Sequence, residues 1–126
     1  LAGLNILVVD DNACNLKLMQ LVLKKFSCLP KTALSGAEAL ELLKDNSYDL
    51  CFMDIQMPEM NGFECSLAIR QQLKLDLPII ACSADVMPED IAKAYDSGMN
   101  DYISKPFTAK LVKACINKWG GKTHEK

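Results

Sequence analysis

The sequence predicts an α/β domain in which a doubly wound parallel sheet carries helices on both faces. Short apolar runs alternate with segments of helical periodicity, so that strand and helix follow one another five times with short connections. Residues 50–53 are apolar throughout, which is typical of a strand buried on both faces. At 126 residues the chain has the length of one domain with a substantial core.

The predicted strands are short, and each ends where polar residues begin. They cover residues 5–9, 29–33, 50–54, 79–82 and 102–103. Because Pro30 has no backbone N–H, the second strand is expected at an edge of the sheet. The predicted helices cover residues 13–26, 35 to a stop at 46–47, 63–73, 88 to a stop at 97–98, and 108–119.

Capping signals support these helix boundaries. Asn12 stands at the N-cap of the first helix, and Ser35 with Glu38 has the spacing of a capping box. Pro88 suits the first turn of the fourth helix, where no intrahelical N–H bond is needed. Gly120 follows the last helix as a C-terminal stop.

The charge balance argues against nucleic acid or an anionic membrane as the direct partner. The chain has 14 basic and 16 acidic residues and no basic block, which gives a net charge of −2. No apolar run approaches the ~20 residues of a membrane helix, and no signal peptide opens the chain. Because the chain does not begin with methionine, we expect it to be a segment of a longer protein.

The six cysteines include no C-x-x-C pair and several lie in apolar stretches, so we expect buried reduced thiols rather than disulfides or a zinc site. That usage predicts a cytoplasmic protein. The one histidine, His124, lies in a polar C-terminal stretch that is expected to be a disordered tail over residues 121–126. The domain is therefore expected to cover residues 1–120.

Polar or charged side chains follow four of the predicted strands at one edge of the sheet. They are, in strand order, Asp10 and Asp11, Asp54, Ser83, and Lys105. Each alone would be interpreted as a cap, a turn residue or a surface charge, but their coincidence at strand ends, where ligands bind in open α/β sheets, indicates a site.

If the strand order is 2-1-3-4-5, the first and third strands are neighbours ~4.8 Å apart and their three carboxylates share a pocket. Two carboxylates ~4 Å apart repel by ~4 kcal/mol at an effective dielectric constant of ~20. The pocket therefore needs a cation or protonated acids. Oxygen ligands select a hard ion, here Mg²⁺ or Mn²⁺.

Four motifs carry a resemblance to a known family. They are VVDDN at 8–12, MDIQMPEMNG at 53–62, SA at 83–84 and KPF at 105–107. In order and spacing they resemble response-regulator receiver (CheY-like) domains, and the loop at 53–62 is most similar to the receivers of hybrid sensor histidine kinases. The resemblance spans nearly the whole chain and implies a (βα)5 flavodoxin-like fold with a five-stranded parallel sheet of order 2-1-3-4-5.

The resemblance also implies the roles of the acidic residues. Asp54 would accept a phosphoryl group from phosphohistidine in a two-component phosphorelay, forming an acyl phosphate. Asp10, Asp11, Asp54 and the backbone carbonyl of Gln56 would hold Mg²⁺. The domain would catalyse its own phosphorylation and dephosphorylation, and any kinase activity would belong to the rest of a longer chain.

Four further residues take roles from the same resemblance. Lys105 and Ser83 would contact the phosphoryl oxygens, and the bond from Lys105 to Pro106 is expected to be cis. Tyr102 occupies the family's aromatic switch position and would rotate inward after phosphorylation. The alternative for Tyr102 is an ordinary residue of an amphipathic strand.

The resemblance implies a histidine kinase phosphodonor or a histidine phosphotransfer domain as partner, docked near the acid pocket. Met57 and Met60 would either add apolar contact to that partner or pack within their loop.

The chain would be a hybrid-kinase segment or, alternatively, a stand-alone response regulator. An aspartate-nucleophile phosphohydrolase would need a second acid two residues after the nucleophile, where this chain has Gln56. A degenerate receiver would have lost part of the acid pocket.

Overall fold

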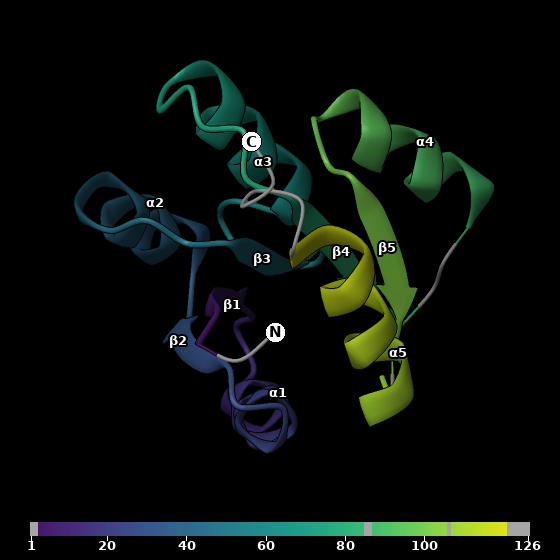
Figure 1. Cartoon of the computed structure of the whole chain (residues 1–126). Helices are drawn as coiled ribbons and strands as arrows, with labels where there is room; N and C mark the ends of the chain where they lie inside the picture. The colour runs from purple at the N-terminus through teal and green to yellow at the C-terminus, as the bar shows by residue number, and fades with distance from the viewer. Residues whose placement is uncertain (1–2, 85–86, 106, 121–126) are drawn as a thin grey trace.

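A computed structural model describes residues 3–84, 87–105 and 107–120, and its sheet has five parallel strands in the order β2-β1-β3-β4-β5 (Figure 1). This confirms the predicted fold. The strands are β1 (Asn5–Val9), β2 (Leu29–Ala33), β3 (Leu50–Asp54), β4 (Ile79–Ser83) and β5 (Asp101–Ser104). The helices are α1 (Ala13–Lys25), α2 (Gly36–Asp45), α3 (Gly62–Gln71), α4 (Pro88–Asp96), α5 (Ala109–Cys115) and the π-helical turn η1 (Ile116–Gly120).

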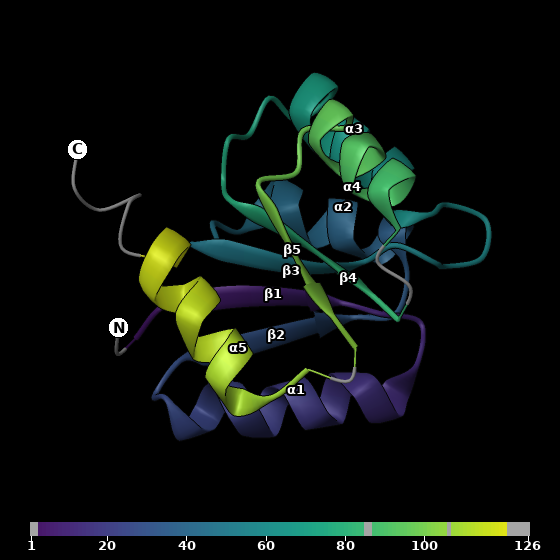
Figure 2. The same cartoon turned by 90° about the vertical axis from the view of Figure 1, so that its right-hand side faces the viewer.

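Helices cover both faces of the sheet. Figure 2 shows α1 and α5 on one face and α2, α3 and α4 on the other. Each face has its own apolar cluster, one centred on Phe52 and Leu23 and the other on Met53 and Ile69, all with no exposed surface. Because consecutive residues of β3 feed opposite clusters, every residue of this strand is buried.

Side chains at helix N-termini fix where α1 and α3 begin. Asn12 accepts hydrogen bonds from the backbone N–H groups of Cys14 (2.9 Å) and Asn15 (3.2 Å) and so caps α1. Asn61 and Glu64 cap α3 with a reciprocal capping box. These two caps start α1 and α3 directly after the loops that follow β1 and β3.

The capping box predicted for α2 forms only in part. Ser35 accepts from the N–H of Glu38 at 3.1 Å, as predicted. The Glu38 carboxylate instead accepts from the N–H of Leu34 at 2.7 Å, one residue before the cap. The donor at Leu34 is satisfied in this way by a side chain from the first turn of the helix.

The last predicted helix differs from the structure in its final turn. The chain is α-helical only to Cys115 and continues as the π-helix η1 to Gly120. In this wider turn the indole Nε1–H of Trp119 donates to Asp101 Oδ2 at 2.9 Å. The prediction of a regular α-helix over residues 108–119 was wrong for this turn.

Arg70, near the end of α3, joins three segments that sequence analysis did not connect. Its guanidinium donates to the carbonyl of Gly98 (2.9 Å), the carbonyl of Leu75 (2.8 Å) and Oδ1 of Asn100 (2.9 Å). Asn100 Oδ1 also accepts from the N–H of Ile79 at 2.9 Å. The fork of donors on one arginine thus fixes the loops that lead into β4 and β5.

All six cysteines are free thiols, which agrees with the expected absence of disulfides. Five are buried, but Cys14 is exposed on the first turn of α1, contrary to the expectation of burial. Among the described residues, no helix combines the length and the apolar character needed to cross a membrane.

Gly62 allows α3 to begin against the end of β3. A Cβ atom at this position would lie 2.9 Å from Ile55 Cα and would overlap the carbonyl oxygen of Asp54. Gly62→Ala must therefore displace backbone, and we expect it to lower the free energy of unfolding by about 1–3 kcal/mol. Urea denaturation followed by circular dichroism measures this difference.

Gly36→Ala is the matched control, because it also adds one methyl group to the first turn of a helix. The nearest atom to that methyl group is Sδ of Met60, at 2.8 Å, which belongs to a flexible side chain. Repacking of Met60 and the better helix propensity of alanine should keep the change within about 1 kcal/mol. Equal destabilisation by the two substitutions would contradict the backbone constraint at Gly62.

Candidate functional site

The carboxyl ends of β1 and β3 bring three carboxylates together. Asp10 and Asp54 are 4% and 5% exposed, whereas Asp11 is exposed. Each of the three offers an oxygen, and these oxygens lie within 4.8 Å of one another. The structure thus forms the acidic pocket that the sequence predicts, with two of its acids buried.

Lys105 delivers a positive charge to two of these acids. Its Nζ atom lies 3.0 Å from Asp10 Oδ2 and 3.0 Å from Asp54 Oδ1, and its side chain is 17% exposed. The backbone N–H of Lys105 donates to the carbonyl of Ser83 at 2.8 Å, which fixes the chain as it leaves β5. Because these charge-assisted hydrogen bonds of Lys105 are largely shielded from solvent, they are stronger than ion pairs on the surface.

Backbone donors hold the two buried carboxylates in place. The N–H of Asn12 donates to Asp10 Oδ1 at 2.9 Å, and the N–H of Gln56 donates to the Asp54 carboxylate. The sequence predicts only a capping role for Asn12, and for Gln56 only a backbone carbonyl that holds the metal. A backbone donor two residues after an aspartate is a common turn geometry, and that spacing could have predicted both bonds.

The electrostatics of the pocket favour protonation of Asp54 in the absence of a further cation. The pKa of Asp54 is raised to about 6, because burial and, to a smaller extent, the charge of Asp10 outweigh the lowering effect of Lys105 and the Gln56 N–H. Burial would lower the pKa of Lys105, but its bonds to Asp54 and Asp10 outweigh this and raise that pKa. Both shifts favour the bound proton, through burial at Asp54 and through the two neighbouring carboxylates at Lys105.

The donor set fits a small hard cation. Three carboxylate oxygens within reach of one another match the ligands of Mg²⁺, and the exposure of Asp11 leaves one side open to solvent and its waters. The Lys105 ammonium neutralises only part of the charge. A divalent cation held by Asp10, Asp11 and Asp54 would supply the rest.

Ser83 and Tyr102 lie beside the acidic pocket on β4 and β5. Both line a small apolar cavity between these strands and α4, together with Ile55 and Ile91. Ser83 is buried, and Tyr102 is 37% exposed. The predicted switch pair therefore shares one cavity, whose remaining lining residues are Ala81, Asp90, Ala94 and Ile103.

The structure describes the two predicted methionine contacts but not the predicted cis bond or the C-terminal tail. Met57 is buried, and Met60 packs against the apolar cluster between the sheet and the helices α2 and α3. Both methionines therefore pack within the fold. Pro106, with the expected cis bond, and the tail with His124 lie outside the described residues.

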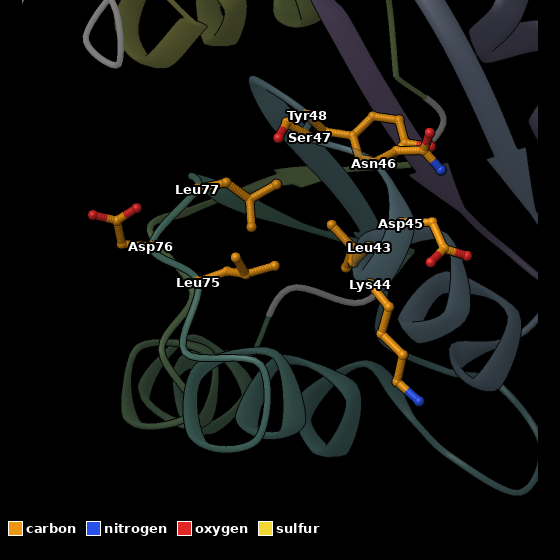
Figure 3. Close-up of a pocket in the computed structure, with 9 residues that line it drawn as sticks. All are labelled: Leu43, Lys44, Asp45, Asn46, Ser47, Tyr48, Leu75, Asp76 and Leu77. Atoms are coloured by element: carbon orange, nitrogen blue, oxygen red, sulfur yellow. The ribbon is translucent and has the colours of Figure 1, made fainter.

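A larger hollow of about 420 Å³ lies where β3 and β4 begin, away from the acidic pocket (Figure 3). Leu43, Leu75 and Leu77 point into it from two walls. Its other lining residues are Lys44, Asp45, Asn46, Ser47, Tyr48 and Asp76. Because the acids described above gather at the opposite strand ends, the candidate site is defined by its charges and not by the volume of a cavity.

Comparison with known proteins agrees with this geometry. The family model described as response regulator receiver domain matches residues 6–117. Hybrid signal transduction histidine kinase L of Dictyostelium discoideum is 43% identical over 122 residues, which cover 91% of this chain and 7% of that protein. The chain thus spans a small part of this curated relative, and it spans 14% of each of two rice proteins described as probable histidine kinases.

Solved structures of receiver domains superpose closely on the fold. One is the co-crystal structure of the Saccharomyces cerevisiae histidine phosphotransfer signaling protein Ypd1 with the receiver domain of its downstream response regulator Ssk1. There the TM-score is 0.89 at 31% identity, over 97% of this chain and 92% of that chain. Another is the receiver domain of a Pseudomonas aeruginosa sensor histidine kinase with a magnesium ion coordinated in its active site cleft. It gives a TM-score of 0.86 at 30% identity, over 95% of this chain and 99% of that chain.

Membership of one family explains three features of this chain. They are the order of the strands, the acids at the strands' carboxyl ends and the lysine that contacts two of those acids. The family model supports this assignment over residues 6–117. This chain belongs to the response regulator receiver domain family of two-component signal transduction.

Proposed function

We propose that Asp54 accepts a phosphoryl group from phosphohistidine in a reaction that requires Mg²⁺. The observation that carries this proposal is the position of Lys105 Nζ, 3.0 Å from both Asp54 and Asp10 at the ends of buried strands. A nucleophile needs an anionic oxygen near cations that neutralise the incoming phosphoryl group. Asp54 meets these conditions, since it contacts Lys105, ends the buried strand β3 and belongs to the three-acid group. Asp10 shares these features, and the resemblance of the motif at 53–62 to receiver domains is what favours Asp54 as the nucleophile.

Asp10, Asp11, Asp54 and the carbonyl of Gln56 would hold the metal. The support for this assignment is the three-carboxylate group and the magnesium ion in the Pseudomonas receiver described above. A bound Mg²⁺ would neutralise negative charge on the phosphoryl oxygens. Mn²⁺ has the same ligand preference and would support the same chemistry.

In the proposed step a carboxylate oxygen of Asp54 attacks phosphorus, the N–P bond of phosphohistidine breaks, and the imidazole leaves with the electron pair. Lys105 would then turn its ammonium from the Asp54 carboxylate to a phosphoryl oxygen, while Asp10 keeps it in place. Hydrolysis by water would return the Asp54 carboxylate and inorganic phosphate. The domain supplies its own catalytic groups for both steps.

The shape change would follow from Ser83 and Tyr102. The Ser83 hydroxyl would donate to a phosphoryl oxygen and draw its loop toward Asp54. Tyr102, 37% exposed at the cavity it shares with Ser83, would then rotate inward. The apolar lining of that cavity suits the face of the tyrosine ring.

The partner is inferred to be a histidine kinase or a histidine phosphotransfer protein, and the parent protein to be a hybrid histidine kinase with this domain in the cytoplasm. The kinases among the curated relatives and the Ypd1 complex support this choice. A stand-alone response regulator is the second candidate. A phosphohydrolase is disfavoured because position 56 is an exposed glutamine and offers no acid for a leaving group.

Incubation with acetyl phosphate and Mg²⁺ should add one phosphoryl group, which intact-mass spectrometry would detect. Asp54→Asn should abolish the adduct, because the amide is not a nucleophile of comparable strength. Removal of the metal with EDTA should slow labelling at least about tenfold, since the carboxylates would otherwise repel the donor.

Asp76→Asn is the matched control, because it removes an exposed acid at the opposite end of the sheet. It should be labelled at the wild-type rate. An undiminished adduct on Asp54→Asn, or no adduct on the wild type, would contradict the proposal.

Without metal, Asp54 should make stability fall as pH rises. Its pKa is about 6 in the folded state against its usual 3.8, so the folded protein holds this proton more tightly than the unfolded chain does. Its contribution is present below pH 4 and is lost as pH rises to about 6. From pH 4 to pH 7 the difference in unfolding free energy, wild type minus Asp54→Asn, should fall by about 2–3 kcal/mol.

Urea denaturation of both proteins in EDTA at several pH values measures this difference. Excess Mg²⁺ should reduce the fall, because binding to the ionised acids stabilises the folded state. A difference that rises with pH in EDTA would show that Lys105 outweighs burial at Asp54.

A further inference from the structure

The carboxylate of Asp101, at the first residue of β5, joins two distant parts of the chain. Its Oδ1 accepts from the backbone N–H of Tyr102 at 2.8 Å, and its Oδ2 accepts from the indole N–H of Trp119 in η1 at 2.9 Å. Lys118 Nζ lies 3.5 Å from the same Oδ2. One side chain thus binds the strand that carries Tyr102 and the turn that carries Trp119.

Asp101 lies on an edge strand of the sheet, where its side chain replaces a missing strand partner. β5 pairs with β4 and is the last strand in the sheet order, so its other edge has no strand partner. Asp101 satisfies the N–H of Tyr102 with a side chain in place of a neighbouring strand. A shift of the backbone at Tyr102 would therefore act directly on the Asp101 carboxylate.

β5 is short enough to transmit such a shift along its length. It has four residues, from Asp101 to Ser104, and Lys105 follows at once with its Nζ on Asp10 and Asp54. The Lys105 N–H donates to the Ser83 carbonyl at 2.8 Å. The groups that would meet a phosphoryl group are thus one short strand away from the Asp101–Trp119 hydrogen bond.

The π-helical turn η1 follows directly on the α-helical part of α5, so α-helical geometry is its natural alternative. A π-helix contains about one extra residue per turn relative to an α-helix, and such turns are rare and frequently lie at functional sites. A return of residues 116–120 to α-helical geometry would rotate later side chains by a large angle and remove the indole of Trp119 from Asp101. Lys118, 5.3 Å from the Trp119 ring centroid, would move with it.

We propose that Asp101 couples the position of Tyr102 to the conformation of η1, so that phosphorylation of Asp54 alters the turn that holds Trp119. The proposal rests on the proposed function, since it assigns an output to the same site. It makes Asp101 a positioning residue that carries the change from the carboxyl end of β5 to the opposite end of the sheet. Coupling of this kind is reciprocal, so a change in η1 must also alter the affinity of the acid site for a phosphoryl-like ligand.

The chain contains one tryptophan, so Trp119 gives a single indole N–H resonance in ¹H–¹⁵N NMR. We expect this resonance to move on phosphorylation with acetyl phosphate and Mg²⁺, by more than Mg²⁺ alone moves it. Intact mass of the same sample reports the adduct on Asp54 independently. A complete adduct with an unmoved indole resonance would overturn the coupling alone, and absence of an adduct would overturn the proposed function with it.

Two variants separate coupling from a merely structural contact. Trp119→Phe keeps an aromatic ring but removes the donor to Asp101, and it should change the affinity for beryllofluoride, a tetrahedral phosphoryl analogue, by about fivefold. Lys118→Met removes the charge beside Asp101 and leaves the indole bond, so it should retain wild-type affinity. Equal beryllofluoride affinities of the wild type and a folded Trp119→Phe would overturn the proposal. If Trp119→Phe does not fold, the wild-type resonance decides.

Discussion

The site depends on one constraint, the sharing of a single ammonium by two buried carboxylates. Lys105 Nζ lies 3.0 Å from both Asp10 and Asp54, and burial still raises the pKa of Asp54 to about 6. A pocket with this imbalance favours any further positive charge. In the proposed function, the same imbalance would favour binding of a metal and, once metal and lysine neutralise its charge, acceptance of a phosphoryl group.

The fold creates this arrangement because the carboxyl ends of its parallel strands meet at one edge of the sheet. The order β2-β1-β3-β4-β5 makes β1 and β3 neighbours, so Asp10 and Asp54 follow adjacent strands, while β5 brings Lys105 from the far side of β4. Gly62 lets α3 start against the end of β3. The rigid backbone therefore holds the carboxylates close together, although their like charges repel one another.

The strands and the acid pocket were predictable because they depend on local apolar runs and on the rule that parallel strands end at one edge. The network of Arg70 was not, since a charged helix residue resembles a solvent-facing one and its partners are backbone carbonyls far along the chain. The π-helical end of the last helix was missed because no side-chain pattern marks an extra residue per turn. Cys14 was expected to be buried, but it lies on the outer side of α1.

Calorimetric titration of Mg²⁺ into the wild type and Lys105→Met tests the central claim most directly. If lysine and metal neutralise the same carboxylates, loss of the ammonium should raise the Mg²⁺ affinity on the order of tenfold, since a positive charge close to the metal site is removed. Labelling by acetyl phosphate should nevertheless slow, because the phosphoryl oxygens lose a donor. An unchanged or weaker Mg²⁺ affinity in Lys105→Met would contradict the account.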